Sequence, residues 1–195
     1  MEQDVASPCP MCSDPKGLRL RTHVDTIPYF GEHTQVTLLC MACGWRQTDL
    51  IPAESVDPSA WSLPVKGPED LTARVVRSTG CTVRIPELDL EVAPGSSSTG
   101  YVSNVEGVLV RFSDVLDIVE RDLEASDVEA IATLEHLRAA LAMAILGAPT
   151  MPLTLELLDP TGRSVILSDD ASQRPLTETE LANLPLGPEV PVFSA

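Results

Sequence analysis

The chain has 195 residues, with 29 acidic and 13 basic side chains and a formal net charge of −16. This excess of carboxylates argues against a protein that neutralises nucleic-acid phosphates or docks on anionic lipid, because both functions need a basic face. At 44% hydrophobic the chain can bury a core, so we do not expect it to be disordered as a whole. No apolar run reaches the roughly 18 residues of a membrane-spanning helix, and the N-terminus lacks a secretory pattern, so we expect a cytoplasmic protein.

The acidity is uneven along the chain. Residues 1–50 carry a net charge of −2 and residues 51–112 a net charge of −3, whereas residues 113–195 carry −11. The negative charge therefore says little about what the first 50 residues contact.

Four of the five cysteines are spaced as two pairs. Cys9 and Cys12 form one C-x2-C motif, and Cys40 and Cys43 form a second after a gap of 27 residues. Two such knuckles supply four thiolates to one tetrahedral zinc ion and leave no open position for water, which defines a structural rather than a catalytic metal. Gly44 permits the unusual backbone angle that the tight turn of a knuckle needs.

Other uses of the paired cysteines are weaker. Disulfides are disfavoured in a chain without a secretory signal and with an odd number of cysteines, and a redox dithiol needs only one pair. His23 and His33 lie between the knuckles and are alternative ligands. Cys81 is predicted to be a small buried strand residue. We therefore predict one structural Zn²⁺ held by the four paired cysteines.

Residues 1–50 are predicted to form a zinc ribbon. Apolar and polar side chains alternate from Leu18 to Thr26, and a second strand-like run leads into the second knuckle. Between these runs, Tyr29 and Phe30 lie in a Pro/Gly loop. The pair is either a hydrophobic clasp over a small domain or an exposed anchor for a protein partner, and the sequence leaves both interpretations open.

Residues 51–170 are predicted to form a β-domain. Residues 51–70 hold four prolines without a clear period and are predicted to be an irregular connection, whereas residues 72–92 alternate as several short strands. Asp159 to Gly162 has the residues of a type I turn, which joins two further strands as a hairpin.

A helical hairpin is predicted within this domain, at about residues 113–147. Apolar side chains recur there at helical spacing in two runs, and Ser126 with Glu129 has the spacing of a capping box for the second helix. From residue 171 the composition turns polar and rich in proline. Residues 171–195 are therefore predicted to be a flexible or loosely packed tail.

Six stretches match one protein family in chain order. Between about residues 9 and 167 they read CPMC, IPYFGE, CMACGWR, RVVRSTGCTVRIPELDLEV, GYVSNVEGVL and LDPTGRSVI. The chain resembles the ZPR-type zinc-finger proteins, and its single set of motifs is similar to archaeal members rather than to eukaryotic ones, which repeat the module. The resemblance implies a β-rich α+β fold. Its parts are an N-terminal zinc ribbon and a double-stranded β-helix (jelly-roll-like) domain with an α-helical hairpin.

The resemblance also implies a function in binding rather than catalysis. Eukaryotic relatives bind elongation factor 1-alpha, a GTPase that delivers tRNA, and act as its folding chaperone. The chain is therefore expected to bind a GTPase of that type as a chaperone or adaptor, with its zinc carried by the four paired cysteines. The candidate partner contacts are Tyr29, Phe30, Asn104 and Glu106, and capping of a loop is the stronger interpretation of the last two.

Two other functional classes fit the sequence less well. A zinc-ribbon module associated with nucleic acid or transcription is the alternative function, but Arg19, Arg21 and Arg46 are the only arginines of a nearly neutral ribbon. An enzyme is not expected. Outside the ribbon only His136 remains among the histidines, and neither a nucleophile–base pair nor a cofactor loop is recognisable.

Overall fold

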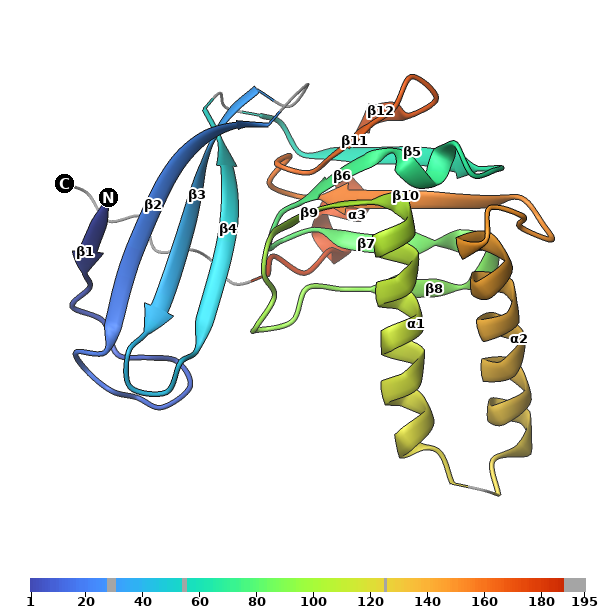
Figure 1. Ribbon diagram of the computed structural model, residues 1–195, viewed down its shortest axis with the longest axis horizontal. Coiled ribbons are helices and arrows are strands. Elements are labelled where there is room, and N and C mark those ends of the chain that lie inside the picture. The colour runs from blue at the N-terminus through green and yellow to red at the C-terminus, as the bar shows by residue number, and fades with distance from the viewer. Residues whose placement is uncertain (28–30, 54–55, 125, 188–195) are drawn as a thin grey trace.

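The computed structural model describes residues 1–27, 31–53, 56–124 and 126–187. An N-terminal sheet stands beside a larger β-domain, and two helices project from that domain (Figure 1). This arrangement confirms the β-rich fold with a separate ribbon and a helical hairpin.

The N-terminal sheet is antiparallel, with strand order β1-β2-β3-β4. Its strands are β1 (Glu2–Asp4), β2 (Leu18–Ile27), β3 (Gly31–Cys40) and β4 (Arg46–Pro52). The alternation seen in the sequence becomes one long hairpin, in which β2 pairs with β3 from Leu18 opposite Cys40 to Ile27 opposite Gly31. Leu20, Leu38 and their neighbours form a small buried cluster against the knuckles. The ribbon therefore has little core of its own apart from the region next to its cysteines.

The β-domain consists of two sheets that share one core. Strands in the order β12-β5-β10-β7-β8 form one sheet, and strands in the order β11-β6-β9 form the other. The buried cluster takes Leu155 and Leu157 from the first sheet and Val75 and Ile166 from the second. The strands are β5 (Ser59–Val65), β6 (Arg74–Arg77), β7 (Thr82–Ile85), β8 (Leu90–Val92), β9 (Tyr101–Asn104), β10 (Leu153–Asp159), β11 (Val165–Leu167) and β12 (Ser172–Pro175). Short 3-10 helices cover Asp70–Thr72 and Pro86–Leu88.

One strand lies where an irregular connection was predicted. β5 contains Pro64, yet it pairs along its whole length with β10. On its other side β12 covers only the stretch from Ser59 to Ser62, so β5 has no strand neighbour there at Pro64. The missing N–H of the proline is tolerated at such an open edge, which is why proline was a misleading signal here.

The helical hairpin consists of α1 (Val105–Asp122) and α2 (Val128–Ile145), two antiparallel helices that extend away from the sheets (Figure 1). The prediction of residues 113–147 placed the first helix too late. Asn104 caps α1, whose first two turns place Val105, Val108 and Phe112 in the core, so the helix starts as a continuation of β9. The predicted capping box at Ser126 is also wrong, because Asp127 is the N-cap of α2. In the described part of the chain, no helix is long and apolar enough to cross a membrane.

The predicted tail is ordered over its first part. β12 pairs with β5, and α3 (Glu178–Asn183) follows with a complete capping box between Thr177 and Glu180. Leu176 is buried against Ala60 and Leu158, and this contact anchors a segment whose composition is otherwise polar. Residues 172–183 therefore have regular secondary structure within the predicted tail, although β12 and α3 bury no side chain, and residues 188–195 lie outside the described residues.

The ribbon joins the β-domain through β4. The buried carboxylate of Asp49 accepts a hydrogen bond from the amide of Thr79 and pairs with Arg163, each at 3.1 Å. Leu50 adds an apolar contact to a cluster that includes Val76 of the β-domain. The predicted boundary at residue 50 falls inside β4, because this strand belongs to the ribbon by pairing and touches the β-domain by its side chains.

Candidate metal centre

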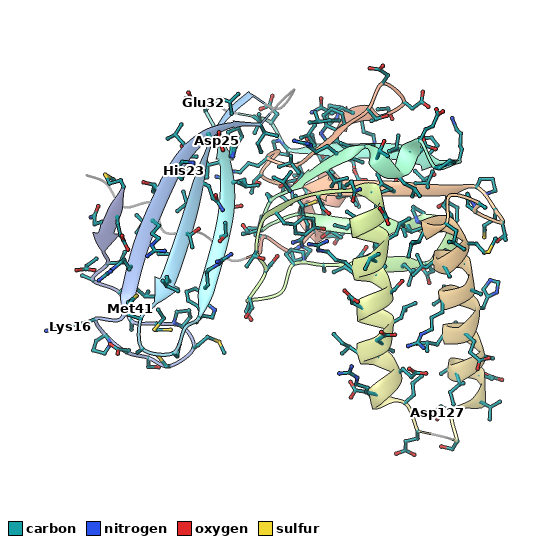
Figure 2. The ribbon with its side chains drawn as sticks, viewed as in Figure 1. Lys16, His23, Asp25, Glu32, Met41 and Asp127 are labelled. Carbon is teal, nitrogen blue, oxygen red and sulfur yellow. The ribbon has the colours of Figure 1, made fainter. Side chains whose placement is uncertain are left out.

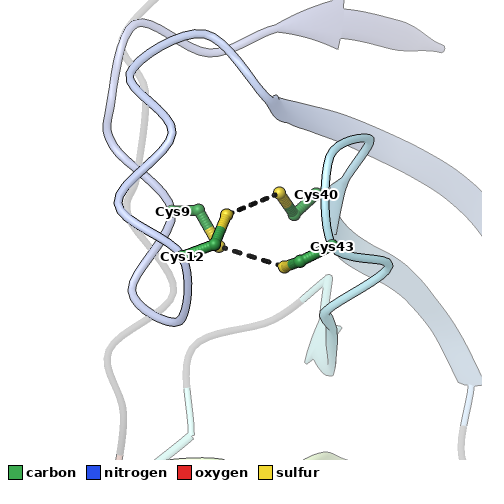
Figure 3. A group of neighbouring side chains, drawn as sticks. All are labelled: Cys9, Cys12, Cys40 and Cys43. Atoms are coloured by element: carbon green, nitrogen blue, oxygen red, sulfur yellow. Dashed lines mark hydrogen bonds between the residues drawn. The ribbon is translucent and has the colours of Figure 1, made fainter.

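The four paired cysteines meet at one end of the ribbon. Cys9 and Cys12 lie in the loop between β1 and β2, Cys40 ends β3, and Cys43 lies in the turn before β4. Figure 3 shows their sulfur atoms facing one another across the two loops. The Sγ atoms of Cys9 and Cys43 are 3.8 Å apart, those of Cys12 and Cys40 are 3.7 Å apart, and all four lie within 4.8 Å of one another.

This geometry fits a tetrahedral zinc ion. With a Zn–S bond of about 2.3 Å, the edge of a regular sulfur tetrahedron is about 3.8 Å. The observed separations are far longer than the roughly 2 Å of a disulfide, and all four cysteines are free thiols. The cluster is therefore a zinc site with four thiolate ligands, and Zn²⁺ bound there would act as a structural ion.

Neither histidine of the ribbon takes part in the cluster. Asp25 lies opposite His33 in the β2–β3 pairing, seven positions from the end where Leu18 lies opposite Cys40. Figure 2 shows His23 and Asp25 toward one end of the ribbon and Met41 at the other. The alternative of a histidine ligand is therefore wrong, because strand register places both histidines far from the sulfurs.

The two knuckles use the same turn. The amide of Ser13 donates to the carbonyl of Cys9, and the amide of Gly44 donates to the carbonyl of Cys40, each at 2.9 Å. The residue after the second cysteine is left-handed in both knuckles, with φ of 59° at Ser13 and 74° at Gly44. The sequence pointed to Gly44 alone. Ser13 follows Cys12 as Gly44 follows Cys43, and this equivalence could have identified the first turn from the sequence.

The pKa values of the thiols differ within the cluster. Burial raises the pKa of Cys9, but the amides of Cys12 and Met11 donate toward its sulfur and lower the pKa to about 7. The amide of Asp14 lowers the pKa of Cys12, yet burial and the neighbouring sulfurs together raise it to about 12. Within the first knuckle the two thiols therefore have opposite shifts in pKa, and four thiolates at this distance need a cation to stabilise them.

The fifth cysteine has a different environment. Cys81 is fully buried in the core of the β-domain, as predicted, but it lies just before β7 and not within a strand. Burial, with the nearby charge of Asp159, raises the pKa of its thiol to about 12. Cys81 is therefore a protonated core residue and not a metal ligand.

The candidate partner contacts are not brought together with the zinc site. Tyr29 and Phe30 lie outside the described residues. The side chain of Asn104 accepts a hydrogen bond from the amide of Gly107 at 2.9 Å and so caps α1. Glu106 is exposed in the first turn of that helix. Binding of a partner by these four residues stays a prediction.

The fold and the sulfur cluster define a zinc-ribbon protein built on a jelly-roll-like domain. The ZPR1 jelly-roll domain matches residues 69–183 of the chain. The chain belongs to the ZPR1 family.

Relatives match over different shares of their own length. A ZPR1-like protein of Pyrococcus horikoshii is 35% identical over 184 residues, which are 93% of this chain and 81% of the relative. A ZPR1-like protein of Methanocaldococcus jannaschii is 35% identical over 187 residues, which are 96% of this chain and 92% of the relative. The zinc finger chaperone zpr1 of Schizosaccharomyces pombe is 31% identical over 167 residues, which are 84% of this chain but 35% of the relative.

Proposed function

We propose that this protein is a chaperone or adaptor for a protein partner, and that the partner is a translation GTPase of the elongation factor 1-alpha type. Family membership and the chaperone name of the Schizosaccharomyces pombe relative support a role in protein binding. The resemblance stated above supports the choice of GTPase.

One structural observation carries the proposal, namely apolar side chains exposed on the two projecting parts of the molecule. At the knuckle tips Met11 is 64% exposed and Met41 is 58% exposed. On the hairpin Ile118 is 57% exposed and Val128 is 70% exposed. Apolar side chains at such positions serve a protein that must hold another protein, and methionine adapts well to surfaces of different shape.

The charge of the hairpin supports a partner with a basic surface. Residues 113–195, which include most of the hairpin, carry a net charge of −11. Opposite charge on the partner would speed association and make its rate depend on salt.

Two further parts of the proposal concern what the protein does not do and where it acts. We propose that it has no catalytic activity, because four thiolates leave no coordination position for a water molecule on zinc. Two of the three ribbon arginines are in ion pairs, Arg19 with Asp4 and Arg21 with Glu2, which makes the nucleic-acid alternative the weaker proposal. We place the function in the cytoplasm, where the thiols of the zinc site stay reduced.

The test is a binding titration of the zinc-loaded protein with purified elongation factor 1-alpha of the same organism, at the organism's own salt concentration. A double variant of the knuckle tips (Met11→Ser with Met41→Ser) and a hairpin variant (Ile118→Ser) should each weaken binding about tenfold, the effect of removing one good apolar contact. Val24→Ser is the matched control, because Val24 is 58% exposed but lies on the ribbon sheet away from both surfaces. If the intact protein does not bind the factor at micromolar concentration, the choice of partner is wrong.

A further inference from the structure

A pocket with no assigned role lies in the β-domain, between α1, β9 and the loop that follows β8. Its volume is about 450 Å³, which is within the range of about 300–1,000 Å³ typical of pockets for small molecules. Most of its wall is apolar, and the side chains of Val83, Val92, Val108 and Phe112 contribute to it. Its charged lining consists of two arginines, Arg77 and Arg111, and one carboxylate, Asp114.

Arg77 is a buried cation whose hydrogen-bond partners are all neutral. It is 6% exposed and donates to the carbonyl of Cys81 at 2.7 Å, the hydroxyl of Ser98 at 3.1 Å and the carbonyl of Thr99 at 3.3 Å. No carboxylate in the described part of the chain forms an ion pair with it. A buried charge without an opposite charge is costly, so this arrangement favours an anion nearby.

Arg111 is a second positive charge in the pocket, and both arginines lie close to the ring of Tyr101. Its guanidinium carbon lies 4.3 Å from the centre of the Tyr101 ring, and that of Arg77 lies 5.6 Å from the same point. Arg111 donates once, to the carbonyl of Gly107 at 2.8 Å. Among the residues that the structure describes, no carboxylate pairs with Arg111 either.

The burial of Arg77 sets it apart from the other arginines. Six arginines of the chain form an ion pair with an acidic side chain. Arg46, Arg74 and Arg121 form none within the described residues, but they are exposed to solvent, as is Arg111. With two arginines and one carboxylate in its wall, the pocket has a small excess of positive charge in a protein whose net charge is −16.

We propose that this pocket binds a small molecule with a carboxylate or phosphate head and an apolar body. Guanidinium groups bind both kinds of head through charge-assisted hydrogen bonds, and Arg111 has unused N–H groups for this purpose. The apolar body would lie against Val92, Val108 and Phe112. This site is separate from the zinc cluster, and its α1 wall ends at Val115, one turn before Ile118 of the proposed partner surface.

The test uses the full zinc-loaded chain and three probes of equal chain length, which are octanoate, octyl phosphate and octanol. Binding is followed by calorimetry and by amide chemical shifts. We expect saturable binding of at least one anionic probe, with shifts at Val92, Tyr101 and Phe112, and binding of octanol at least about tenfold weaker. Which anionic probe binds more tightly tells a carboxylate site from a phosphate site.

Two variants and a matched control test the role of the pocket residues. Arg111→Gln should weaken binding of the anionic probe about tenfold, the usual effect of losing one charge-assisted hydrogen bond. Ala93→Trp, at an exposed position of the pocket wall, should block binding while leaving the amide spectrum elsewhere unchanged. Arg121→Gln removes the same charge from an exposed site on α1 outside the pocket and should leave binding unchanged.

Three results would overturn the proposal. The first is that no anionic probe binds saturably, and the second is that octanol binds as tightly as octanoate. The third is that Arg111→Gln and Arg121→Gln weaken binding equally, because the effect would then come from net charge rather than from the pocket.

Discussion

The residue after the second cysteine of each knuckle sets the turn that aims the sulfurs. Gly44 has φ of 74°, and a Cβ atom added there would meet no atom within 4 Å. Ser13 holds the equivalent position with φ of 59°. Both knuckles therefore need a left-handed backbone at this position. Only the second knuckle has a glycine there, which adopts this conformation without strain.

This difference gives a prediction at the residue scale. Gly44→Ala should lower the stability of the zinc-loaded ribbon by about 1 kcal/mol, because the left-handed backbone is unfavourable for alanine while space for its Cβ is available. Ser13→Gly should change stability by less than about 0.5 kcal/mol, because relief of strain offsets the greater chain entropy of glycine. Competition with a zinc chelator measures both, and a 1 kcal/mol loss corresponds to an apparent affinity about fivefold weaker.

Gly67→Ala serves as the control for these variants. A Cβ at Gly67 also meets no atom within 4 Å, and its φ lies outside the left-handed region. An equal loss of zinc affinity in Gly67→Ala and Gly44→Ala would show that the knuckle turn is not the cause.

Asn104 connects a side chain to the start of a whole element. Its side chain caps α1, so Asn104→Ala should lower the free energy of unfolding by about 1 kcal/mol, whereas Asn104→Ser, which retains a cap, should lower it by much less. Thermal unfolding followed by circular dichroism measures the difference. If alanine reduces partner binding while leaving stability unchanged, the side chain acts in recognition rather than in capping.

The β12–α3 segment is expected to depend on pH through one carboxylate. The hydrogen bond from Arg174, helped by the Thr177 cap, lowers the pKa of Glu180 to about 2 from its usual value of 4.5. Because the folded-state pKa is the lower one, the stabilisation is fully present above about pH 4.5 and is lost as pH falls toward 2. The hydrogen-exchange protection factors of Leu181 and its neighbours, taken relative to the intrinsic rate at each pH, should therefore fall over this window.

Two variants of α3 separate this effect from general acid unfolding. Glu180→Gln should make exchange in α3 faster at neutral pH and remove most of the acid dependence, since the charged partner of Arg174 is gone. Glu178→Gln removes an exposed carboxylate of the same turn and should behave like the natural chain. If all three proteins respond alike to acid, the Arg174–Glu180 pair does not hold the segment.

At the element scale, features fixed by neighbours in sequence were predictable and features fixed by distant neighbours were not. The C-x2-C spacing and the alternation along β2 are local, so the sulfur cluster and the ribbon hairpin followed directly from the sequence. β5 and β12 are held by strands far away in the chain, and their proline and polar residues concealed them. The pocket around Arg77 combines four separate segments, so nothing in the linear sequence pointed to it.

At the scale of the whole molecule, zinc and β4 together decide how the ribbon is held. One end of the ribbon depends on the sulfur cluster, and the strand nearest the β-domain depends on the buried carboxylate of Asp49. Because β3 pairs with β4, the loss of structure that follows removal of the metal should spread from the knuckles to β4. It should then weaken the ion pair between Asp49 and Arg163. The β-domain has its own core, shared by both of its sheets, and does not depend on the ribbon for it.

Replacement of one zinc ligand tests this division. Cys40→Ser should abolish tight zinc binding and remove hydrogen-exchange protection from β2 and β3, because the small ribbon cluster includes Cys40 itself. Amides of β10 should keep their protection, since Leu155 and Leu157 lie in the core of the β-domain. Chelation of zinc from the natural chain is the control and should give the same exchange pattern. Protection of β2 and β3 that survives in Cys40→Ser would mean that the strands, and not the metal, hold the ribbon together.

Asp49→Asn tests the other end of this division, the contact between β4 and the β-domain. It should leave zinc affinity unchanged and speed exchange at Thr79, whose amide donates to Asp49.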